Sequence, residues 1–305
     1  MLTIFLATSM LLAQPEEFFA DYGLVPDTRY EITVHQYRES GGIVSRDAHG
    51  RVVLKLHEPQ EGPSVLFATI ELDEHQITPE QLDAIGMTPE DLQSTAEFVL
   101  DEQYNIVGVR NWEELRDKAN TVASNLMDAM VEQGLSDPET AQKAKTAMSK
   151  LTNTEAGVHS IYSKRISTYL FGYGWELTES EPLVQEVSLS NPFGGEPLPA
   201  ITTTKLDDDP ETPNLIEYTY EQALESEPAV ALIRDALLLM GIPDNKDLIE
   251  NLRGLQITDL MEWSYDKSQR LIIHAQVERT MKLPGQPLSI ERWTWELVDI
   301  KEDGQ

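Results

Sequence analysis

Three long segments at the end of the chain alternate polar and apolar residues, and they constrain the fold more than any other feature. They are Leu255 to Tyr265, Arg270 to Leu283 and Leu288 to Val298, with the short turn Asp266–Gln269 between the first two. Alternation with a period of two predicts strands that bury one face, and a tight turn predicts antiparallel pairing. The chain is therefore predicted to contain a sheet built largely from hairpins.

The first hundred residues repeat this strand pattern. The alternating or apolar runs are Tyr30–His35, Val52–His57, Val65–Leu72, Glu97–Leu100 and Ile106–Val109. We place a turn at Asp47–Gly50, directly before the second run, and another at Asp101–Asn105, between the last two. Three more strands are predicted later, at Leu183–Leu189, Ile201–Leu206 and Leu215–Tyr220.

Helices interrupt the strands twice. From Asn111 to Phe171 apolar residues recur at helical spacing, and Gly172 and Gly174 end this block. A second, almost wholly apolar helix is predicted at Ala229–Met240, followed by a short one at Asp244–Leu252. About 13 apolar residues are too few to span a bilayer, so we expect the helix at 229–240 to be buried in the fold.

This order of elements predicts an α+β fold. We expect a large curved antiparallel sheet, half-barrel-like, with helices inserted mid-chain and before the last three strands. Residues 14–305 are predicted to form a single domain, and a division into two lobes would fall near residues 191–199, where Pro and Gly accumulate.

The chain begins with a short uncharged apolar run, MLTIFLATSMLLA, followed by Gln14-Pro15-Glu16-Glu17. Such a run is too short for a membrane span but typical of the core of a secretory signal peptide, and Ala13 is the small residue that a signal peptidase prefers. No Lys or Arg precedes it. We interpret residues 1–13 as a signal peptide and predict a soluble periplasmic protein that begins near Gln14.

Charge and cysteine content exclude several classes of protein. Lys and Arg number 23 against 53 Asp and Glu, which gives a net charge of −30. Nucleic acids and anionic membrane surfaces are recognised by Lys and Arg, so neither is an expected partner. The chain has no cysteine, which excludes disulfides, thiolate nucleophiles and lipid attachment at a mature N-terminal cysteine.

No motif in the sequence predicts a catalytic residue, a metal site or a cofactor. Gly-x-Ser-x-Gly, His-Glu-x-x-His, Walker and dinucleotide-binding motifs are absent. The six histidines are scattered, and His35, His57 and His274 fall on the polar faces of their strands, where solvated side chains are expected. The acidic run Asp207–Glu211 lacks the spacing of an EF-hand loop and is interpreted as a solvated turn.

Aromatic residues in the last strands are the best candidates for a binding site. Trp263 and Tyr265 share one face of a strand, as do Trp293 and Trp295. If the strands are neighbours in a curved sheet, these rings form either a plain core or the wall of an apolar groove. In the second case Leu232, Leu237 and Met240 from the apolar helix are expected to face them.

With its apparent signal sequence, many antiparallel strands and helices inserted midway, the chain resembles the lipoprotein-carrier-like half-barrel proteins of the bacterial envelope. The resemblance is one of architecture. It implies a long antiparallel sheet that wraps around helices and holds acyl chains, but no motif transfers a binding residue.

Three classes of function follow from these observations. The leading one is a non-enzymatic binding protein for a lipid or another hydrophobic ligand. The second is a hydrolase whose catalytic groups converge only in three dimensions. The third is an envelope interaction or structural protein without a small-molecule site, for which another envelope protein would be the partner.

Overall fold

The computed structural model describes residues 17–72, 79–102, 104–174, 176–178, 182–189, 198–208, 212, 214–224, 227–228, 230–231, 234 and 254–302. The predicted signal peptide and most of the predicted helices at 229–240 and 244–252 lie outside these residues. None of the described helices is long and apolar enough to cross a membrane.

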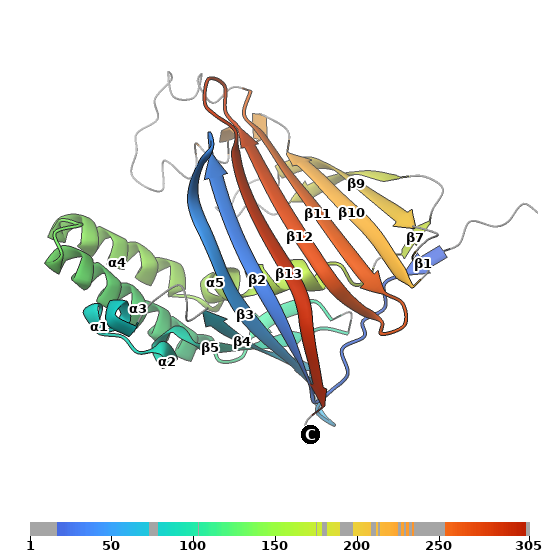
Figure 1. Ribbon diagram of the computed structural model, residues 1–305, viewed down its shortest axis with the longest axis horizontal. Helices are drawn as coiled ribbons and strands as arrows, with labels where there is room; N and C mark the ends of the chain where they lie inside the picture. The colour runs from blue at the N-terminus through green and yellow to red at the C-terminus, as the bar shows by residue number, and fades with distance from the viewer. Residues whose placement is uncertain are drawn as a thin grey trace, which may run out of the picture.

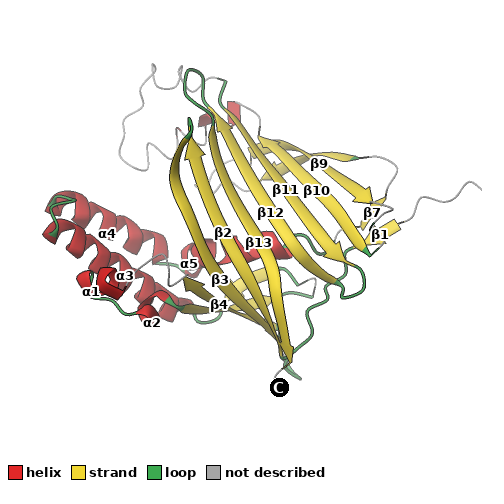
Figure 2. Ribbon diagram, viewed as in Figure 1, coloured by secondary structure: helices red, strands yellow, loops and turns green. Residues whose placement is uncertain are grey.

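One antiparallel sheet of 11 strands dominates the fold, and its two edges do not meet (Figures 1 and 2). This confirms the predicted α+β class and the large curved sheet. From one edge to the other the order is β6 (Ile106–Val109), β5 (Ser94–Leu100), β4 (Val65–Leu72), β3 (Ile43–His57), β2 (Thr28–Ser40), β13 (Ser289–Glu302), β12 (Leu271–Lys282), β11 (Gln256–Asp266), β10 (Leu215–Leu224), β9 (Leu198–Asp208) and β8 (Leu183–Leu189). A second, two-stranded sheet pairs β1 (Glu17–Phe19) with β7 (Glu176–Thr178).

Strands from opposite ends of the chain pair at the centre of the sheet. β13 runs antiparallel to β2, with Trp295 opposite Val34. The last three strands, β11 to β13, therefore lie between β2 of the first hairpin and β10. The sequence patterns located these strands but did not show this pairing. Each hairpin can be recognised locally, whereas the pairing of β2 with β13 depends on how the whole sheet closes on its core.

The first hairpin differs from its predicted form. The segment Asp47–Gly50, which we expected to be a turn, lies inside β3, and the chain reverses at Gly41 and Gly42. These glycines have φ angles of 59° and 79°. A two-residue hairpin turn with φ positive at both positions favours glycine, because a side chain would crowd the backbone. The long β3 therefore places residues 43–50 opposite the end of β2.

The helices lie within, and shortly before, the block from Asn111 to Phe171 that the sequence predicts to be helical. They are α1 (Pro79–Ala84), α2 (Pro89–Leu92), α3 (Trp112–Glu132), α4 (Pro138–Thr152) and α5 (Glu155–Leu170). Asp137 caps α4 by accepting a hydrogen bond from Thr140 N at 2.9 Å, and Thr154 caps α5 by accepting one from Gly157 N at 3.2 Å. In Figure 1, α3 and α4 extend beyond the sheet, while α5 crosses one of its faces.

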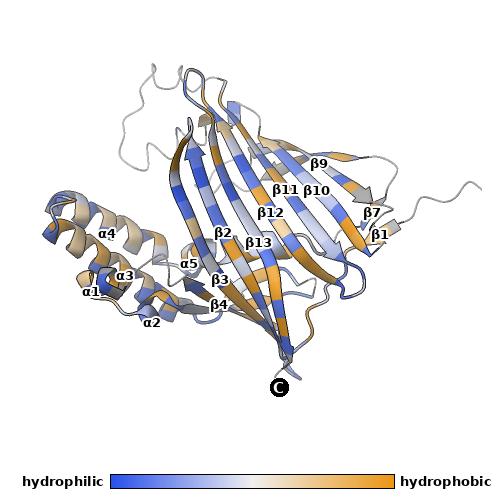
Figure 3. Ribbon diagram, viewed as in Figure 1, coloured by the Kyte–Doolittle hydropathy of each residue, from blue (hydrophilic) through white to orange (hydrophobic). Residues whose placement is uncertain are grey.

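That face, which we call the inner face, carries the core. Directly paired residues Tyr218, Trp263, Ala275, Trp295 and Val34 form one row across five strands, and all are buried. Val158, Ile166 and Tyr169 of α5 belong to the same buried cluster. Figure 3 shows polar and apolar residues alternating along these strands, as a sheet with one solvated face requires.

The opposite face, the outer face, is polar and contains one buried carboxylate. Glu31 accepts hydrogen bonds from Lys301 Nζ at 2.9 Å and from Arg51 Nη1 at 3.2 Å, and Arg29 lies at 3.2 Å. The hydrogen bond from Lys301 is the main reason why the pKa of Glu31 is lowered. These ion pairs tie β13 to β2 and β3 at the end of the sheet where the described chain stops.

Candidate functional site

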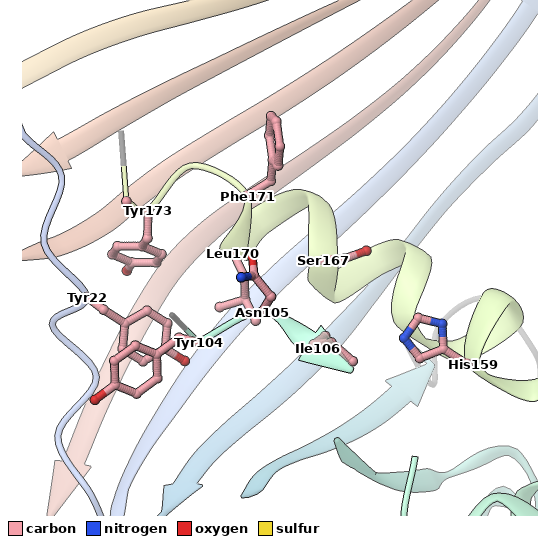
Figure 4. Close-up of a pocket in the computed structure, with 10 residues that line it drawn as sticks. Tyr22, Tyr104, Asn105, Ile106, His159, Ser167, Leu170, Phe171 and Tyr173 are labelled. Carbon is pink, nitrogen blue, oxygen red and sulfur yellow. The ribbon is translucent and has the colours of Figure 1, made fainter. Parts of the chain in front are cut away.

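A pocket of about 400 Å³ lies beside α5, where three segments far apart in the sequence meet (Figure 4). One wall is α5 from His159 onward, with the turn after it. The second is the segment that follows β1, and the third is the turn between β5 and β6. The lining residues are Tyr22, Tyr104, Asn105, Ile106, His159, Ser167, Leu170, Phe171, Tyr173 and Gly174.

The helical wall follows from the spacing of residues along α5. His159, Ser167 and Leu170 recur at intervals that bring them to one side of a helix, and Phe171 continues this side at the C-cap. From His159 to Phe171 the helix rises about 18 Å, at about 1.5 Å for each residue. The pocket is therefore elongated, with His159 at one end and the tyrosine rings at the other (Figure 4).

The turn between β5 and β6 holds Tyr104 in an unusual conformation. Asp101 accepts a hydrogen bond from Asn105 N at 2.8 Å and closes the turn. Tyr104 has a φ angle of +61°, a region that costs a bulky residue about 1–3 kcal/mol and that is concentrated at functional sites. In this position its ring stacks on Tyr22, with centroids 3.9 Å apart and planes 8° apart.

Tyr173 joins this pair and fixes it to the sheet. Its ring meets Tyr22 edge-on at 5.1 Å, and its hydroxyl accepts a hydrogen bond from Ile272 N of β12 at 2.9 Å. Gly174 N donates to Ala20 O at 2.7 Å, which holds the turn after α5 against the N-terminal segment. The three tyrosines thus form one rigid end of the pocket.

The tyrosines keep this end of the pocket uncharged. Burial raises the pKa of Tyr22, Tyr104 and Tyr173 above the usual tyrosine value, and the neighbouring phenols and Glu58 raise it further for Tyr22. All three hydroxyls therefore stay protonated at neutral pH. Tyr104 donates its own to Glu58 Oε1 at 3.2 Å, outside the pocket lining.

Two polar atoms of the pocket lack partners. Tyr22 Oη and His159 Nε2 are buried and make no hydrogen bond to any described residue. A buried polar group without a partner costs about 1–3 kcal/mol, so such groups in a native structure usually meet water or a ligand. These two atoms are the points at which the pocket can bind the polar part of a ligand.

The aromatic residues predicted from the sequence occupy the inner face instead. Trp263, Tyr265 and Trp295 are 1–3% exposed, and Trp293, which stacks on Trp295 at 6.3 Å, is half-buried. β12 separates their strands, but the register places Trp263 and Trp295 in one row through Ala275. None of the four lines the pocket described above.

The predicted cluster and the pocket nevertheless share a boundary. Phe171, which lines the pocket, lies 6.0 Å from Trp263 and 5.3 Å from Tyr220, centroid to centroid. Gly172 makes this approach feasible, because a Cβ atom there would lie 2.5 Å from Trp263 Cδ1. Leu232, Leu237 and Met240 lie outside the described residues, so the groove that they were expected to complete stays a prediction.

Sequence patterns gave no sign of the pocket. Tyr104 lies in a segment that reads simply as a hairpin turn, Tyr22 precedes the first predicted strand, and Tyr173 lies between two glycines that read as a helix end. Only the topology brings these segments together. A tyrosine in a turn that lacks glycine at the position of positive φ has no sequence signature.

Comparisons with known proteins do not assign the chain to a family. No protein-family model and no curated protein matches the sequence. Among solved structures the chain is similar to part of lipovitellin, in a structure of its lipid–protein interactions, with 11% identity and a TM-score of 0.41. This match covers 92% of the chain but 26% of the lipovitellin chain, so the chain spans about a quarter of that protein.

It is also similar to a DUF1329 family protein from Desulfovibrio piger, with 11% identity and a TM-score of 0.19. That match covers 92% of this chain and 87% of the other. Because both TM-scores are below 0.5, neither similarity supports a functional assignment.

Proposed function

We propose that this protein binds, without catalysis, an uncharged elongated hydrophobic molecule such as a lipid with a neutral head group. The observation that carries the proposal is the pocket beside α5, with its rigid tyrosine end and the partnerless atoms Tyr22 Oη and His159 Nε2. Largely apolar walls with a small number of polar groups, here at the two ends of the pocket, are typical of small-molecule sites.

The size of the pocket fits this class of ligand. Its volume of about 400 Å³ falls in the range of about 300–1,000 Å³ that small-molecule sites occupy. Its length of about 18 Å along α5 favours an extended chain over a compact ring system. Each Å² of apolar surface removed from water contributes about 25 cal/mol, so an alkyl chain along Ile106, Leu170 and Phe171 gains most of its affinity from burial.

The charge of the site favours a neutral ligand. Among the residues that the structure describes, its lining includes no Lys, Arg, Asp or Glu, and its tyrosine hydroxyls are protonated. An ionised head group would be buried without a partner of opposite charge, which is costly. The net charge of −30 adds a general repulsion against anionic lipids.

The geometry of the pocket does not favour the alternative that the protein is a hydrolase. Ser167 and His159 both line it, but eight residues along one helix separate them, a rise of about 12 Å. A nucleophile and its base must approach within hydrogen-bond distance. Ser167 instead donates its hydroxyl hydrogen bond to Ser163 O at 2.8 Å.

The groove predicted from the sequence remains part of the proposal. The groove is lined by four aromatic residues of the inner face, Trp263, Tyr265, Trp293 and Trp295, and it adjoins the pocket where Phe171 packs against Trp263. We propose that a long ligand continues from the pocket toward the half-buried Trp293. Leu232, Leu237 and Met240 would then cover its far end.

The substitution Tyr104→Asn tests the pocket. Asparagine tolerates positive φ, so it keeps the turn while removing the ring that stacks on Tyr22. We expect the affinity for Nile red, a neutral solvatochromic dye, to fall at least tenfold, because one wall of the pocket is lost. A neutral monoacylglycerol should displace the dye from the unmodified protein. The free energy of unfolding should change by no more than about 1.5 kcal/mol, the value of an aromatic pair.

Val107→Ala is the matched control, because Val107 lies next to Ile106 in β6 and is 60% exposed. Dye affinity should not change in this variant. Equal dye binding by the Tyr104→Asn variant and the unmodified protein, with no displacement by the lipid, would contradict the proposed function.

We further propose that this function is carried out after export. The apolar run at residues 1–13 supports the proposal, since it has the length and the small final residue of a signal peptide core. N-terminal sequencing of the native protein is expected to begin near Gln14. An intact Met1 in a cytoplasmic fraction would refute the proposal.

A further inference from the structure

A second site is formed on the outer face of the first hairpin. Because the chain reverses at Gly41–Gly42, His35 of β2 lies directly opposite His49 of β3. Asp47 lies two residues before His49, and side chains two residues apart in a strand point to the same face. The hairpin therefore brings two imidazoles and one carboxylate together on the solvated side of the sheet.

The three side chains converge on one point. His35 Nε2 lies 2.8 Å from Asp47 Oδ1, and His49 Nε2 lies 3.7 Å from the same oxygen. The two imidazole rings are stacked, with centroids 4.1 Å apart and planes 3° apart. One ligand atom from each of the three residues lies within 4.8 Å of the others.

This donor set has a definite metal preference. Imidazole nitrogen suits zinc, copper, nickel and iron, whereas calcium and magnesium prefer sites made wholly of oxygen. Zinc binds histidine nitrogen at about 2.0–2.1 Å and carboxylate oxygen at about 2.0–2.2 Å in tetrahedral sites. Ligand atoms at those distances lie about 3.4 Å apart. The pair His35–Asp47, at 2.8 Å, must therefore open by about 0.6 Å, and the wider separations in the group must contract by at most about 1.4 Å.

Such a contraction is feasible because the side chains are accessible. The exposed fractions of the His35, Asp47 and His49 side chains are 36%, 58% and 57%, so their outer torsions can rotate without displacing the core. Beneath His35 the backbone of β2 is paired with β13 on one side and with β3 on the other, and β3 is paired with β2 at Asp47 and His49. A rigid backbone with adjustable side chains reduces the entropy lost when the ion binds.

We propose that His35, Asp47 and His49 bind a divalent transition-metal ion, for which Zn²⁺ is the representative. The three residues supply three ligands and leave one position of a tetrahedral ion to water or to a donor from another molecule. The site lies on the opposite face of the sheet from the pocket and does not depend on the proposed ligand-binding function. The strongly acidic chain raises the local concentration of divalent cations and assists binding.

Isothermal titration of the full chain with ZnCl₂ tests the proposal. We expect one saturable site, and a loss of affinity of at least tenfold in each of the variants His49→Ala and Asp47→Asn. Ca²⁺ should not bind at this site, so titration with CaCl₂ should give the same result for the unmodified protein and for these two variants. Co²⁺ should give the visible absorption of a tetrahedral nitrogen- and oxygen-ligated ion in the unmodified protein and lose it in His49→Ala.

His57→Ala is the matched control, because His57 is also exposed on a strand of the same hairpin and lies 3.6 Å from the carboxylate of Asp27. Its zinc affinity should equal that of the unmodified protein. Circular dichroism confirms that each variant is folded. If zinc binds only weakly and equally to all of these proteins, or if His57→Ala loses as much affinity as His49→Ala, the site is not the one proposed.

Discussion

Replacing Trp263 by alanine is expected to lower the free energy of unfolding by about 3–5 kcal/mol, the usual cost of removing a large buried aromatic side chain. Trp263 is 1% exposed and lies at the centre of the inner face. Its ring stacks on Tyr218 at 5.3 Å and packs against Phe171, and Gly172 approaches it so closely that a Cβ atom there would lie 2.5 Å from Trp263 Cδ1. Urea unfolding followed by circular dichroism measures the loss.

The control for this change is Val184→Ala in the edge strand β8. Val184 is 62% exposed, so its truncation should change stability by no more than about 0.5 kcal/mol. A loss below about 1 kcal/mol for Trp263→Ala would mean that the inner face beneath α5 is not a packed core. Because Trp263 does not line the pocket, this measurement of stability tests the packing of the inner face and not ligand binding.

The second large effect is expected at an ion pair farther along the same face, in which the carboxylate is buried and the guanidinium is half-exposed. Asp259 is 4% exposed and accepts two hydrogen bonds from Arg279, from Nε at 2.6 Å and from Nη2 at 2.7 Å. Hydrogen bonding to Asp259 is also the main reason why the pKa of Arg279 is raised. Arg279→Met would leave the carboxylate buried and unpaired, and we expect a loss of about 3–5 kcal/mol in the free energy of unfolding.

A double variant separates this cause from a simple loss of packing. In Asp259→Leu/Arg279→Met the buried charge is removed together with its partner, and stability should recover by at least half of the loss. The measurement is again urea unfolding of the single and double variants. A double variant as unstable as Arg279→Met would show that the packing of the arginine, rather than its charge, is what matters.

The sequence predicted the elements of the fold more reliably than their arrangement. The final strands, the turn at Asp101–Asn105 and the helices between Asn111 and Phe171 were recognisable, because period-two alternation, helical spacing and capping residues act over a short range. The pairing of β2 with β13 joins residues 249 to 274 positions apart, with no local pattern to mark it. Alternation alone gives the buried face of a strand but not its neighbour.

The misplaced turn at Asp47–Gly50 shows how a local error can hide a site. Asp, His and Gly are reasonable turn residues, and Gly41–Gly42 was the stronger signal, since two adjacent glycines match a two-residue hairpin turn. With the turn placed there, His49 moves from a loop to the strand position opposite His35. The group for which we propose metal binding was therefore accessible to sequence reasoning, through the register of one hairpin.

The pocket was not accessible in this way. Its walls come from residues 22, 104–106 and 159–174, and no spacing within any of these segments indicates a binding function. Trp263 and Trp295 lie on one face although β12 separates their strands, which the sequence allowed as possible neighbours. Large aromatic side chains favour burial in a core as much as contact with a ligand. Burial, which decides between the two, depends on the whole fold.

Photo-crosslinking with a neutral monoacylglycerol that carries a diazirine in its acyl chain tests the central claim most directly. The account predicts label in the peptides that contain Tyr104–Ile106 and Leu170–Gly174, which line the pocket, and competition by unlabelled monoacylglycerol. Label confined to the outer-face strand segments, or label that excess unlabelled lipid does not reduce, would contradict it.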